Sequence, residues 1–340
     1  MTGAAGLCGA RLVEVLLEQK GCELVACLDA SELPKSRAFA SDKRVRWHTG
    51  DVSKLEDVRR AVSGCDAVYH IAALVGPFHP RRKYDLVNRV GSENVVRACS
   101  ELNICKVVFS SSPSTRMDGS DVCFASEHQL SIRLPGQFLE RYAETKAAGE
   151  QAILNACDGD RFLSVAVAPH QVYGPYDGLF LRSFLRASPS LRVVGSGNNR
   201  ISMTYVDNYC EALCNAEDSL KPGASCLGKF YIATDGGSVN LWDVLDDGIG
   251  RLTKNKRPRS KLRVPFPIAM LVARALQLVS RVTGRQFRFT PFSVRMLSIE
   301  RTFDISASKR DLGYNPPHTF DSAWLRTLEW FDQNQWFWQM

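Results

Sequence analysis

Short apolar runs alternate with longer segments of helical periodicity through the first two-thirds of the chain. The strand-like runs are residues 23–28, 45–48, 67–71, 106–110 and 163–167. The helix-like segments between them include residues 10–19, 54–62, 90–99 and 142–156. Strands that alternate with helices indicate βαβ units, in which helices cover both faces of a parallel sheet. We therefore expect an α/β fold with a doubly wound parallel sheet.

From about Gly174 the pattern becomes irregular, because glycines and prolines interrupt shorter elements. We expect a first domain at 1–173 and a smaller substrate-binding lobe at 174–340, some of whose elements return to the first domain. Residues 264–279 are apolar except for Arg274 and Gln277. This segment is shorter than the ~20 residues of a spanning helix. It is either a core or dimer helix, or a helix that lies on a membrane or lines an apolar substrate entrance.

The composition is that of a globular protein, with 45% hydrophobic and 23% charged residues among 340. The net charge is +7, but no basic run is dense enough to predict nucleic-acid binding. The densest basic stretch, residues 254–263, is either a solvated loop or a contact for an anionic membrane. The 11 cysteines are scattered and form no CxxC pair. This predicts no metal site and no disulfide framework, and favours a reducing, cytoplasmic compartment.

A glycine-rich turn opens the chain, with Gly3, Gly6 and Gly9 at three-residue spacing before a helix. Such glycines permit a tight turn, close approach to a pyrophosphate and close helix–strand packing. Asp29 ends the next strand, where an acidic residue binds the adenosine ribose hydroxyls. Because a carboxylate repels a 2′-phosphate, Asp29 favours NAD over NADP. The sheet is therefore expected to be a Rossmann-type NAD-binding domain.

Only Met1 and Thr2 stand where the strand before this turn would end. A central strand that is absent would leave sheet hydrogen-bonding groups unpaired. We therefore expect the chain as written to be poorly stable. Adding about six apolar residues before Met1, the length of a typical strand, should raise its melting temperature.

Tyr142 and Lys146 lie four residues apart in a predicted helix and so share one of its faces. An ammonium group near a phenol favours the phenolate and lowers the phenol pKa. Ser110, Ser111 and Ser112 follow a predicted strand, at the edge of a parallel sheet where ligands bind. One of these hydroxyls could hold a substrate oxygen that Tyr142 protonates or deprotonates. A lone YxxxK is weak evidence, but the order of turn, acid, serines and YxxxK is specific.

With these features the sequence resembles the extended short-chain dehydrogenase/reductase family over essentially its whole length. The matching residues are Thr2-Gly3-x-x-Gly6-x-x-Gly9, Asp29, Gly50-Asp51-Val52, His70-Ile71-Ala72-Ala73, Asn88, Gly91, Asn94, Ser110-Ser111-Ser112, Tyr142-x-x-x-Lys146, Pro169-x-x-Val172-Tyr173-Gly174-Pro175 and Tyr205-Val206-Asp207-Asn208. Ala168 departs from the arginine that the family often has there.

The resemblance implies a role for each matching residue. Ser112 would be the catalytic hydroxyl, with Ser111 or Ser114 as the fallback, beside Tyr142 and Lys146. The implied cofactor-binding residues are Gly3, Gly6, Gly9, Asp29, Asp51, Val52, Ala72, Ala73, Asn88, Tyr142, Lys146, Pro169 and Val172. Among these, Asp51 and Val52 would contact adenine, and Ala72 and Ala73 would line the diphosphate and ribose. Pro169 and Val172 would pack near the nicotinamide.

Within that family the sequence is most similar to the 3β-hydroxysteroid and sterol-4α-carboxylate 3-dehydrogenases. This subgroup is indicated by residues 111–119, 289–291, 301–305 and 312–316. The resemblance implies NAD-dependent oxidation of a sterol 3β-hydroxyl, with decarboxylation where the substrate carries a 4α-carboxylate. It also implies a homodimer, and it leaves open a peripheral contact with the endoplasmic reticulum membrane.

Three alternatives stay open. The first is a sugar-nucleotide epimerase or dehydratase, which tightly co-purifying NAD and turnover of a UDP-sugar would favour. The second is a non-catalytic NAD-binding protein, which would bind NAD without turning over a sterol or a sugar. The third, a reductase of flavonoid-like ketones, would prefer NADPH, and Asp29 argues against it.

Overall fold

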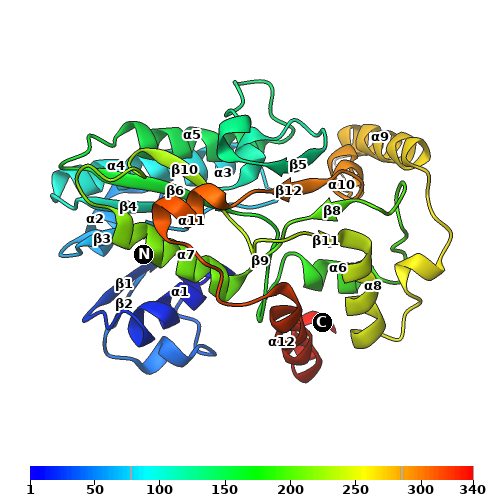
Figure 1. Ribbon diagram of the computed structural model, residues 1–340, viewed down its shortest axis with the longest axis horizontal. Coiled ribbons are helices and arrows are strands. Elements are labelled where there is room, and N and C mark those ends of the chain that lie inside the picture. The colour runs from blue at the N-terminus through cyan, green and yellow to red at the C-terminus, as the bar shows by residue number, and fades with distance from the viewer. Residues whose placement is uncertain (77–78, 284, 286, 340) are drawn as a thin grey trace.

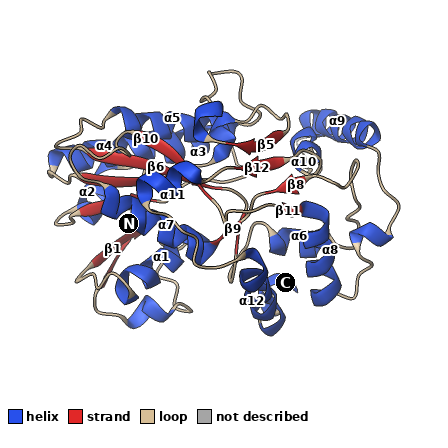
Figure 2. Cartoon of the chain, in the orientation of Figure 1, coloured by secondary structure: helices blue, strands red, loops and turns tan. Residues whose placement is uncertain are grey.

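A parallel sheet forms the centre of the first part of the molecule (Figures 1 and 2). The computed structural model describes residues 1–76, 79–283, 285 and 287–339. Four strands follow one another in this sheet in the order β10, β6, β4, β3, and β1 pairs with β2. Their bounds are β1 Val25–Asp29, β2 Val45–Thr49, β3 Ala67–His70, β4 Lys106–Ser110, β6 Leu163–Pro169 and β10 Lys229–Ala233. All of these pairings are parallel, which confirms the predicted α/β fold.

Thr2 joins the two groups of strands, because it forms parallel bridges to both Leu28 of β1 and His70 of β3. The Thr2 N–H donates to the Tyr69 carbonyl at 3.0 Å, and the Leu28 N–H donates to the Met1 carbonyl at 2.8 Å. The ammonium of Met1 donates to the Ala26 carbonyl at 2.5 Å. Met1 and Thr2 therefore lie between β1 and β3, at the position predicted for the end of the first strand.

Helices form two layers over this sheet (Figure 1). Helix α4 contacts α2 and α5 on one side, and α1 contacts α7 on the other. The bounds are α1 Leu7–Glu18, α2 Leu55–Val62, α4 Gly91–Glu101, α5 Arg141–Asn155 and α7 Val206–Ser219. Shorter pieces are η1 Ala38–Ser41, α3 Arg81–Tyr84, the π-helix η2 Asp85–Val90, η3 Pro113–Arg116 and η4 Glu127–Gln129.

The second part contains short strands and the remaining helices. One sheet has the order β11, β8, β12, β5, and β7 pairs with β9. The strands are β5 Val122–Ala125, β7 Val172–Tyr173, β8 Arg200–Ile201, β9 Thr204–Tyr205, β11 Val239–Asn240 and β12 Arg301–Phe303. The helices are α6 Leu181–Ala187, α8 Leu241–Leu252, η5 Pro258–Ser260, α9 Phe266–Thr283, α10 Pro291–Met296, α11 Ser306–Leu312, α12 Phe320–Gln333 and α13 Trp336–Gln339.

The chain crosses between the two parts more than once. Strand β10 pairs with β6 in the large sheet, although it follows most of the second part in sequence. Helix α7 packs on β4 and β6. In the opposite direction, β5 leaves the first part and pairs with β12. Each part nevertheless has its own apolar core, one centred on the large sheet and one on α6, α8 and α12.

The apolar segment predicted at 264–279 forms α9, which begins at Phe266 and ends at Thr283. Among the helices of the described residues, none combines the length and hydropathy needed to cross a bilayer.

Candidate active site

The glycine-rich turn connects Thr2 to α1, and the Gly3 N–H donates to the Leu28 carbonyl of β1 at 2.8 Å. Gly3 has φ 73°, and a Cβ there would lie 2.7 Å from the Ala72 nitrogen. A Cβ at Gly9 would overlap the carbonyl oxygen of Gly3. At Gly6 a Cβ would lie 3.4 Å from the Gly3 carbonyl oxygen, which is an ordinary van der Waals contact. The turn therefore holds a cradle in front of the α1 N-terminus, which fits the pyrophosphate of a dinucleotide.

Asp29 ends β1 beside this turn. One of its carboxylate oxygens accepts a hydrogen bond from the Ala5 N–H and the other from the Ser31 N–H, both at 2.9 Å. The structure thus brings the predicted acidic residue to the glycine-rich turn. Its contact with the adenosine ribose stays a prediction.

Asp51 and Val52 follow β2. The Asp51 carboxylate accepts the Ser53 N–H at 2.9 Å, and buried Val52 packs closely against Gly91 of α4. The Asn94 amide donates to the Val52 carbonyl at 2.9 Å. The local backbone of these two residues is therefore fixed by α4, and their contact with adenine stays a prediction.

The loop after β3 carries Ala72 and Ala73. The Ala72 N–H donates to the Thr2 hydroxyl at 3.2 Å, which holds this loop against the glycine-rich turn. Asn88 is buried, and its amide accepts the Leu74 N–H at 2.8 Å and donates to the Thr145 hydroxyl at 3.1 Å. Asn88 thus braces this loop against α5, while its own contact with a cofactor stays a prediction.

Ser112 and Tyr142 meet where β4 and α5 approach each other. Ser112 lies close enough to the phenol of Tyr142 to act on its pKa, and Ser112 Oγ lies 2.9 Å from Ser114 Oγ. Ser111 is buried instead and donates to Glu150. Of the three candidate serines, the structure therefore places Ser112 against the tyrosine.

Lys146 lies one helical turn after Tyr142 and is almost fully buried. Its Nζ lies 4.0 Å from the centre of the Phe109 ring. Within the described residues we find no hydrogen-bond acceptor for this Nζ. A buried ammonium without an acceptor fits a partner from outside the chain, such as the hydroxyls of a cofactor ribose.

Burial changes the pKa values of both Lys146 and Tyr142. It lowers the pKa of Lys146 to about 7, although the charge of Glu150 acts in the opposite direction. Burial also raises the pKa of Tyr142 to about 12, partly offset by Ser112. The expected lowering of the phenol pKa is therefore wrong for the chain alone, because removal of the phenol from water outweighs the favourable contacts.

Pro169 and Val172 flank a loop at the end of β6, and both are half-buried. Gln171 between them has φ 47°, a left-handed conformation that is uncommon for a non-glycine residue. The buried ring of His170 lies 2.6 Å from the Ser202 carbonyl through Nδ1 and 3.3 Å from an Arg301 nitrogen through Nε2. This loop is therefore fixed from the second part of the molecule.

The model of the 3-beta hydroxysteroid dehydrogenase/isomerase family matches residues 1–257. The chain belongs to this family. Among its relatives, 3beta-hydroxysteroid-dehydrogenase/decarboxylase isoform 2 of Arabidopsis thaliana is 29% identical, over 97% of this chain and 61% of that protein. The chain thus spans less than two-thirds of that relative's length.

Two other relatives are named for different reactions. The sterol-4-alpha-carboxylate 3-dehydrogenase, decarboxylating, of Homo sapiens is 27% identical over 97% of this chain and 87% of its own. The 2-alkyl-3-oxoalkanoate reductase of Shewanella oneidensis is 31% identical over 78% of this chain and 70% of its own.

Solved structures agree on the fold of this family member. A double mutant of dTDP-glucose 4,6-dehydratase from Streptomyces venezuelae, with NAD bound, has a TM-score of 0.73 at 19% identity. The likeness covers 99% of this chain and 98% of that one. At this identity the likeness shows the α/β fold alone.

The sequence did not predict two buried arginine contacts near the site. Arg116 forms two hydrogen bonds to Glu150, at 2.6 and 3.0 Å. Arg301, beside His170, is 5% exposed, and its Nε has no hydrogen-bond partner in the described part of the chain. Glu150 had a weak signal, because it continues the Tyr142–Lys146 spacing by another four residues. Arg301 had none that a single sequence reveals.

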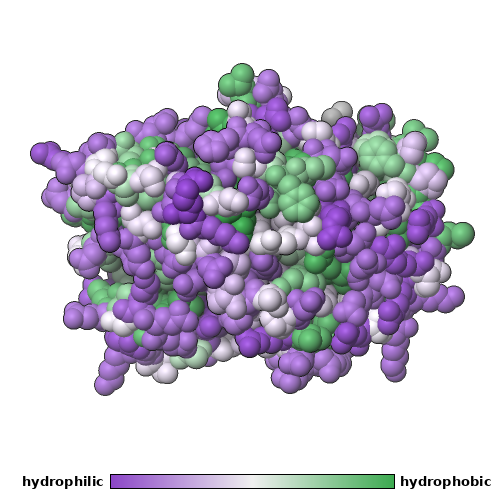
Figure 3. Space-filling model, in the orientation of Figure 1, coloured by the Kyte–Doolittle hydropathy of each residue, from purple (hydrophilic) through white to green (hydrophobic). Residues whose placement is uncertain are grey.

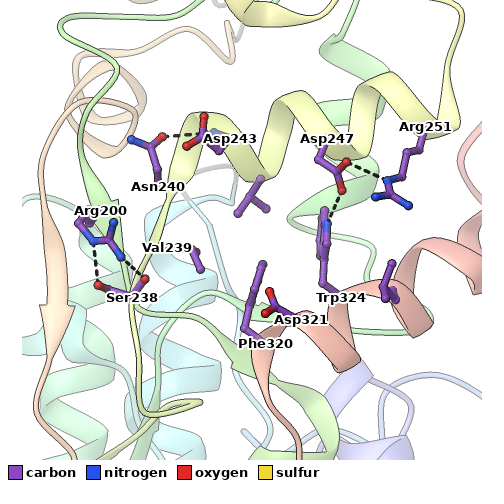
Figure 4. Close-up of a pocket in the computed structure, with 12 residues that line it drawn as sticks. Arg200, Ser238, Val239, Asn240, Asp243, Asp247, Arg251, Phe320, Asp321 and Trp324 are labelled. Carbon is purple, nitrogen blue, oxygen red and sulfur yellow. Dashed lines mark hydrogen bonds and ion pairs between the residues drawn. The ribbon is translucent and has the colours of Figure 1, made fainter.

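A hollow of about 500 Å³ lies elsewhere, between α8 and α12 (Figure 4). None of the predicted site residues lines it. The Asp247 carboxylate there accepts the Trp324 indole N–H at 3.0 Å and the Arg251 guanidinium at 2.8 Å. Because these groups satisfy one another, the hollow is a surface feature of the second part and not a second active site.

Proposed function

We propose that the protein is an NAD-dependent oxidoreductase that oxidises the 3β-hydroxyl of a sterol carrying a 4α-carboxylate. The observation that carries this proposal is the position of Ser112 beside the Tyr142 phenol, with Lys146 one helical turn further along α5. The glycine cradle and the unpaired Lys146 ammonium support a dinucleotide cofactor. Family membership and the names of the relatives support the substrate class.

Different residues of the chain would act on the substrate hydroxyl and on the cofactor. Ser112 would hold the substrate oxygen, and Tyr142, once deprotonated, would take its proton. Lys146, as an ammonium, would favour the phenolate and hold the cofactor ribose. The glycine cradle with the α1 N-terminus would bind the pyrophosphate, and Asp29 the adenosine ribose. NAD supplies the acceptor for the hydride that leaves C3.

The relatives' names support a carboxylate next to the reacting carbon. Both a sterol-4-carboxylate 3-dehydrogenase and a 2-alkyl-3-oxoalkanoate reductase are named for substrates with a carboxyl on the carbon adjacent to the one that bears oxygen. Oxidation of such an alcohol gives a β-keto acid. When this acid loses carbon dioxide, its carboxyl proton passes to the ketone oxygen, and the resulting enol tautomerises to the ketone without a dedicated protein acid.

A substrate screen with purified protein and NAD tests the proposal. We expect NADH formation with a 4α-carboxysterol, a smaller rate with plain 3β-hydroxysteroids and none with UDP-sugars. Turnover of a UDP-sugar would instead support the epimerase or dehydratase alternative. NAD binding without turnover of any of these compounds would support a non-catalytic protein.

Tyr142→Phe provides the matched variant, because it removes only the phenol oxygen. We expect turnover to fall by at least ~10²-fold, the usual contribution of a positioned acid or base, while NADH affinity measured by fluorescence stays within about twofold. Turnover retained in Tyr142→Phe would contradict the mechanism.

We further propose that α9 lies on an anionic lipid surface. Its apolar residues recur at helical spacing on the exposed side, and hydrophobic atoms lie at this end of the molecule in Figure 3. The exposed members are Ile268, Leu271, Val272, Leu278, Val279 and Val282. Exposed basic residues on α9 and close to its two ends in sequence are Arg263, Arg274 and Arg285. An apolar stripe with flanking cations is typical of a helix in the membrane interface.

Flotation with lipid vesicles tests this surface. We expect binding to vesicles that contain phosphatidylserine, weaker binding to phosphatidylcholine alone, and loss of binding in Leu271→Glu. Leu134→Glu is the matched control, because Leu134 is 64% exposed and Leu271 69% exposed. Equal binding by both variants would contradict the proposal, and a dimer that dissociates in Leu271→Glu would assign the stripe to a second copy. An endoplasmic reticulum location is the corresponding cellular proposal.

Two further proposals concern the whole chain. We propose an NAD-binding domain at 1–173, completed by α7 and β10, and a substrate-binding lobe in the rest of 174–340. We also propose the homodimer that the family resemblance implies. Light scattering measures the dimer directly, and a mass of one chain would contradict it.

A further inference from the structure

A buried ion pair lies beneath the catalytic residues. Glu150 is 1% exposed and Arg116 8% exposed at their side chains. The Arg116 guanidinium donates to both carboxylate oxygens, and its plane lies 3.3 Å from the centre of the Phe230 ring. A two-pronged contact of this kind fixes the relative position of the two elements that carry it, η3 and α5.

The same pair reaches the loop of the catalytic serine. Ser111, which precedes Ser112, donates its hydroxyl proton to Glu150. On the other side, the Thr115 hydroxyl accepts from Arg116 at 2.5 Å and donates to the Ser112 carbonyl at 2.8 Å. The backbone around Ser112 is therefore fixed on one side by Glu150, through Ser111, and on the other by Arg116, through Thr115.

Glu150 also lies one helical turn after Lys146, so Tyr142, Lys146 and Glu150 follow one another on one face of α5. The charge of Glu150 opposes the loss of the Lys146 proton that burial favours. The other ionisable groups around Lys146 are His70 on β3, Tyr142 on α5 itself and Arg116 on η3. Between about pH 6 and pH 9 His70 stays neutral and Tyr142 stays protonated, because burial lowers the pKa of His70 to about 3 and raises that of Tyr142 to about 12.

We propose that Glu150 is a positioning residue, which ties the Ser112 loop to the catalytic helix and supplies the negative charge that keeps Lys146 an ammonium. This inference rests on the proposed function, because it assigns Lys146 to a bound nicotinamide cofactor. It adds a residue that touches neither substrate nor cofactor and acts through Ser111 and Lys146.

NADH affinity, measured by fluorescence at a series of pH values, tests the effect of the Glu150 charge on Lys146. In the wild type we expect affinity to weaken as Lys146 loses its proton. In Glu150→Gln the midpoint of this weakening should move about one pH unit lower, the size expected from loss of an opposite charge nearby. Ser111→Ala is the matched control, since it removes the contact to the serine loop and keeps the charge. Its midpoint should not move, while its kcat falls at unchanged NADH affinity.

If Glu150→Gln does not fold, the double variant Glu150→Gln/Arg116→Gln replaces it in the same measurement. The double variant leaves no unpaired guanidinium in the core and is therefore expected to fold. The midpoint should still move lower, but by less than in Glu150→Gln, because the positive charge of Arg116 is removed as well. An unmoved midpoint in a folded Glu150 variant would overturn the inference. NADH binding can be measured without a sterol. If the midpoint moves in Glu150→Gln but the wild type turns over no sterol, the role proposed for Glu150 stands and only the proposed substrate is contradicted.

Discussion

At the scale of single residues, burial decides the protonation of the groups around Lys146. It lowers the pKa of the lysine and raises that of Tyr142, since both lose water as a partner for their charged forms. The sequence predicted both residues and their shared helix face. It could not predict the size of either shift, because burial depends on Phe109 and other residues that are distant in sequence.

His70 shows the same effect in a group that affects stability. Its ring lies between the Thr2 hydroxyl at 2.7 Å and the Ser92 hydroxyl at 3.0 Å, and burial lowers its pKa to about 3. The unfolded chain binds a proton at His70 near pH 6.5, whereas the folded chain does not. Stability is therefore complete above about pH 6.5 and falls as the pH decreases toward 3.

We predict that the wild type loses ~2 kcal/mol of unfolding free energy through His70 between neutral pH and about pH 5. His70→Gln removes the titrating ring and should lose less over the same range. Urea unfolding at the two pH values measures the difference. A loss in the variant equal to that in the wild type would show that other groups, such as His170, account for the acid sensitivity.

At the scale of elements, the long alternating segments were predicted closely. Strand β4 has the predicted bounds Lys106–Ser110, and α5 begins and ends one residue earlier than predicted. The two- and three-residue strands of the second part, such as β8 and β12, escaped prediction. They are too short for a hydrophobic period, and they exist because of partners far away in sequence.

The glycine-rich turn gives a prediction at this scale. Gly9→Ala places a methyl group against the Gly3 backbone, so we expect a large fall in melting temperature. Gly6→Ala adds a methyl group in ordinary van der Waals contact with the Gly3 carbonyl oxygen, at 3.4 Å, so it should keep its melting temperature while NADH affinity falls. Thermal melts with NADH titration separate the two. Unchanged NADH affinity in Gly6→Ala would remove this turn from the cofactor site.

At the scale of the whole molecule, the two parts are interleaved. Strand β10 and α7 complete the large sheet from the second half of the chain, and β5 extends the small sheet from the first half. The arginine contacts that the sequence did not predict have the same origin, since Arg116 and Glu150 are 34 residues apart and His170 and Arg301 are 131 apart. Local patterns predict the pieces of such a site but not the pairs that tertiary packing creates.

We therefore predict that residues 1–173 alone do not form a stable domain, because β6 would lose its neighbour β10 and the sheet would lose the cover of α7. Circular dichroism should show no cooperative melt for this fragment, and NADH fluorescence should show no binding. The complete chain should melt in a single transition. A cooperative melt of the fragment would contradict the interleaved arrangement as a source of stability.

The exposed apolar stripe of α9 also bears on how rates would be measured. If the protein takes its sterol from a lipid surface, the relevant quantity is the mole fraction of sterol within the bilayer. Adding more vesicles of the same composition would then leave the velocity of bound protein unchanged, whereas diluting the sterol with inert lipid would reduce it. Assays that vary only the bulk amount of sterol would miss this dependence.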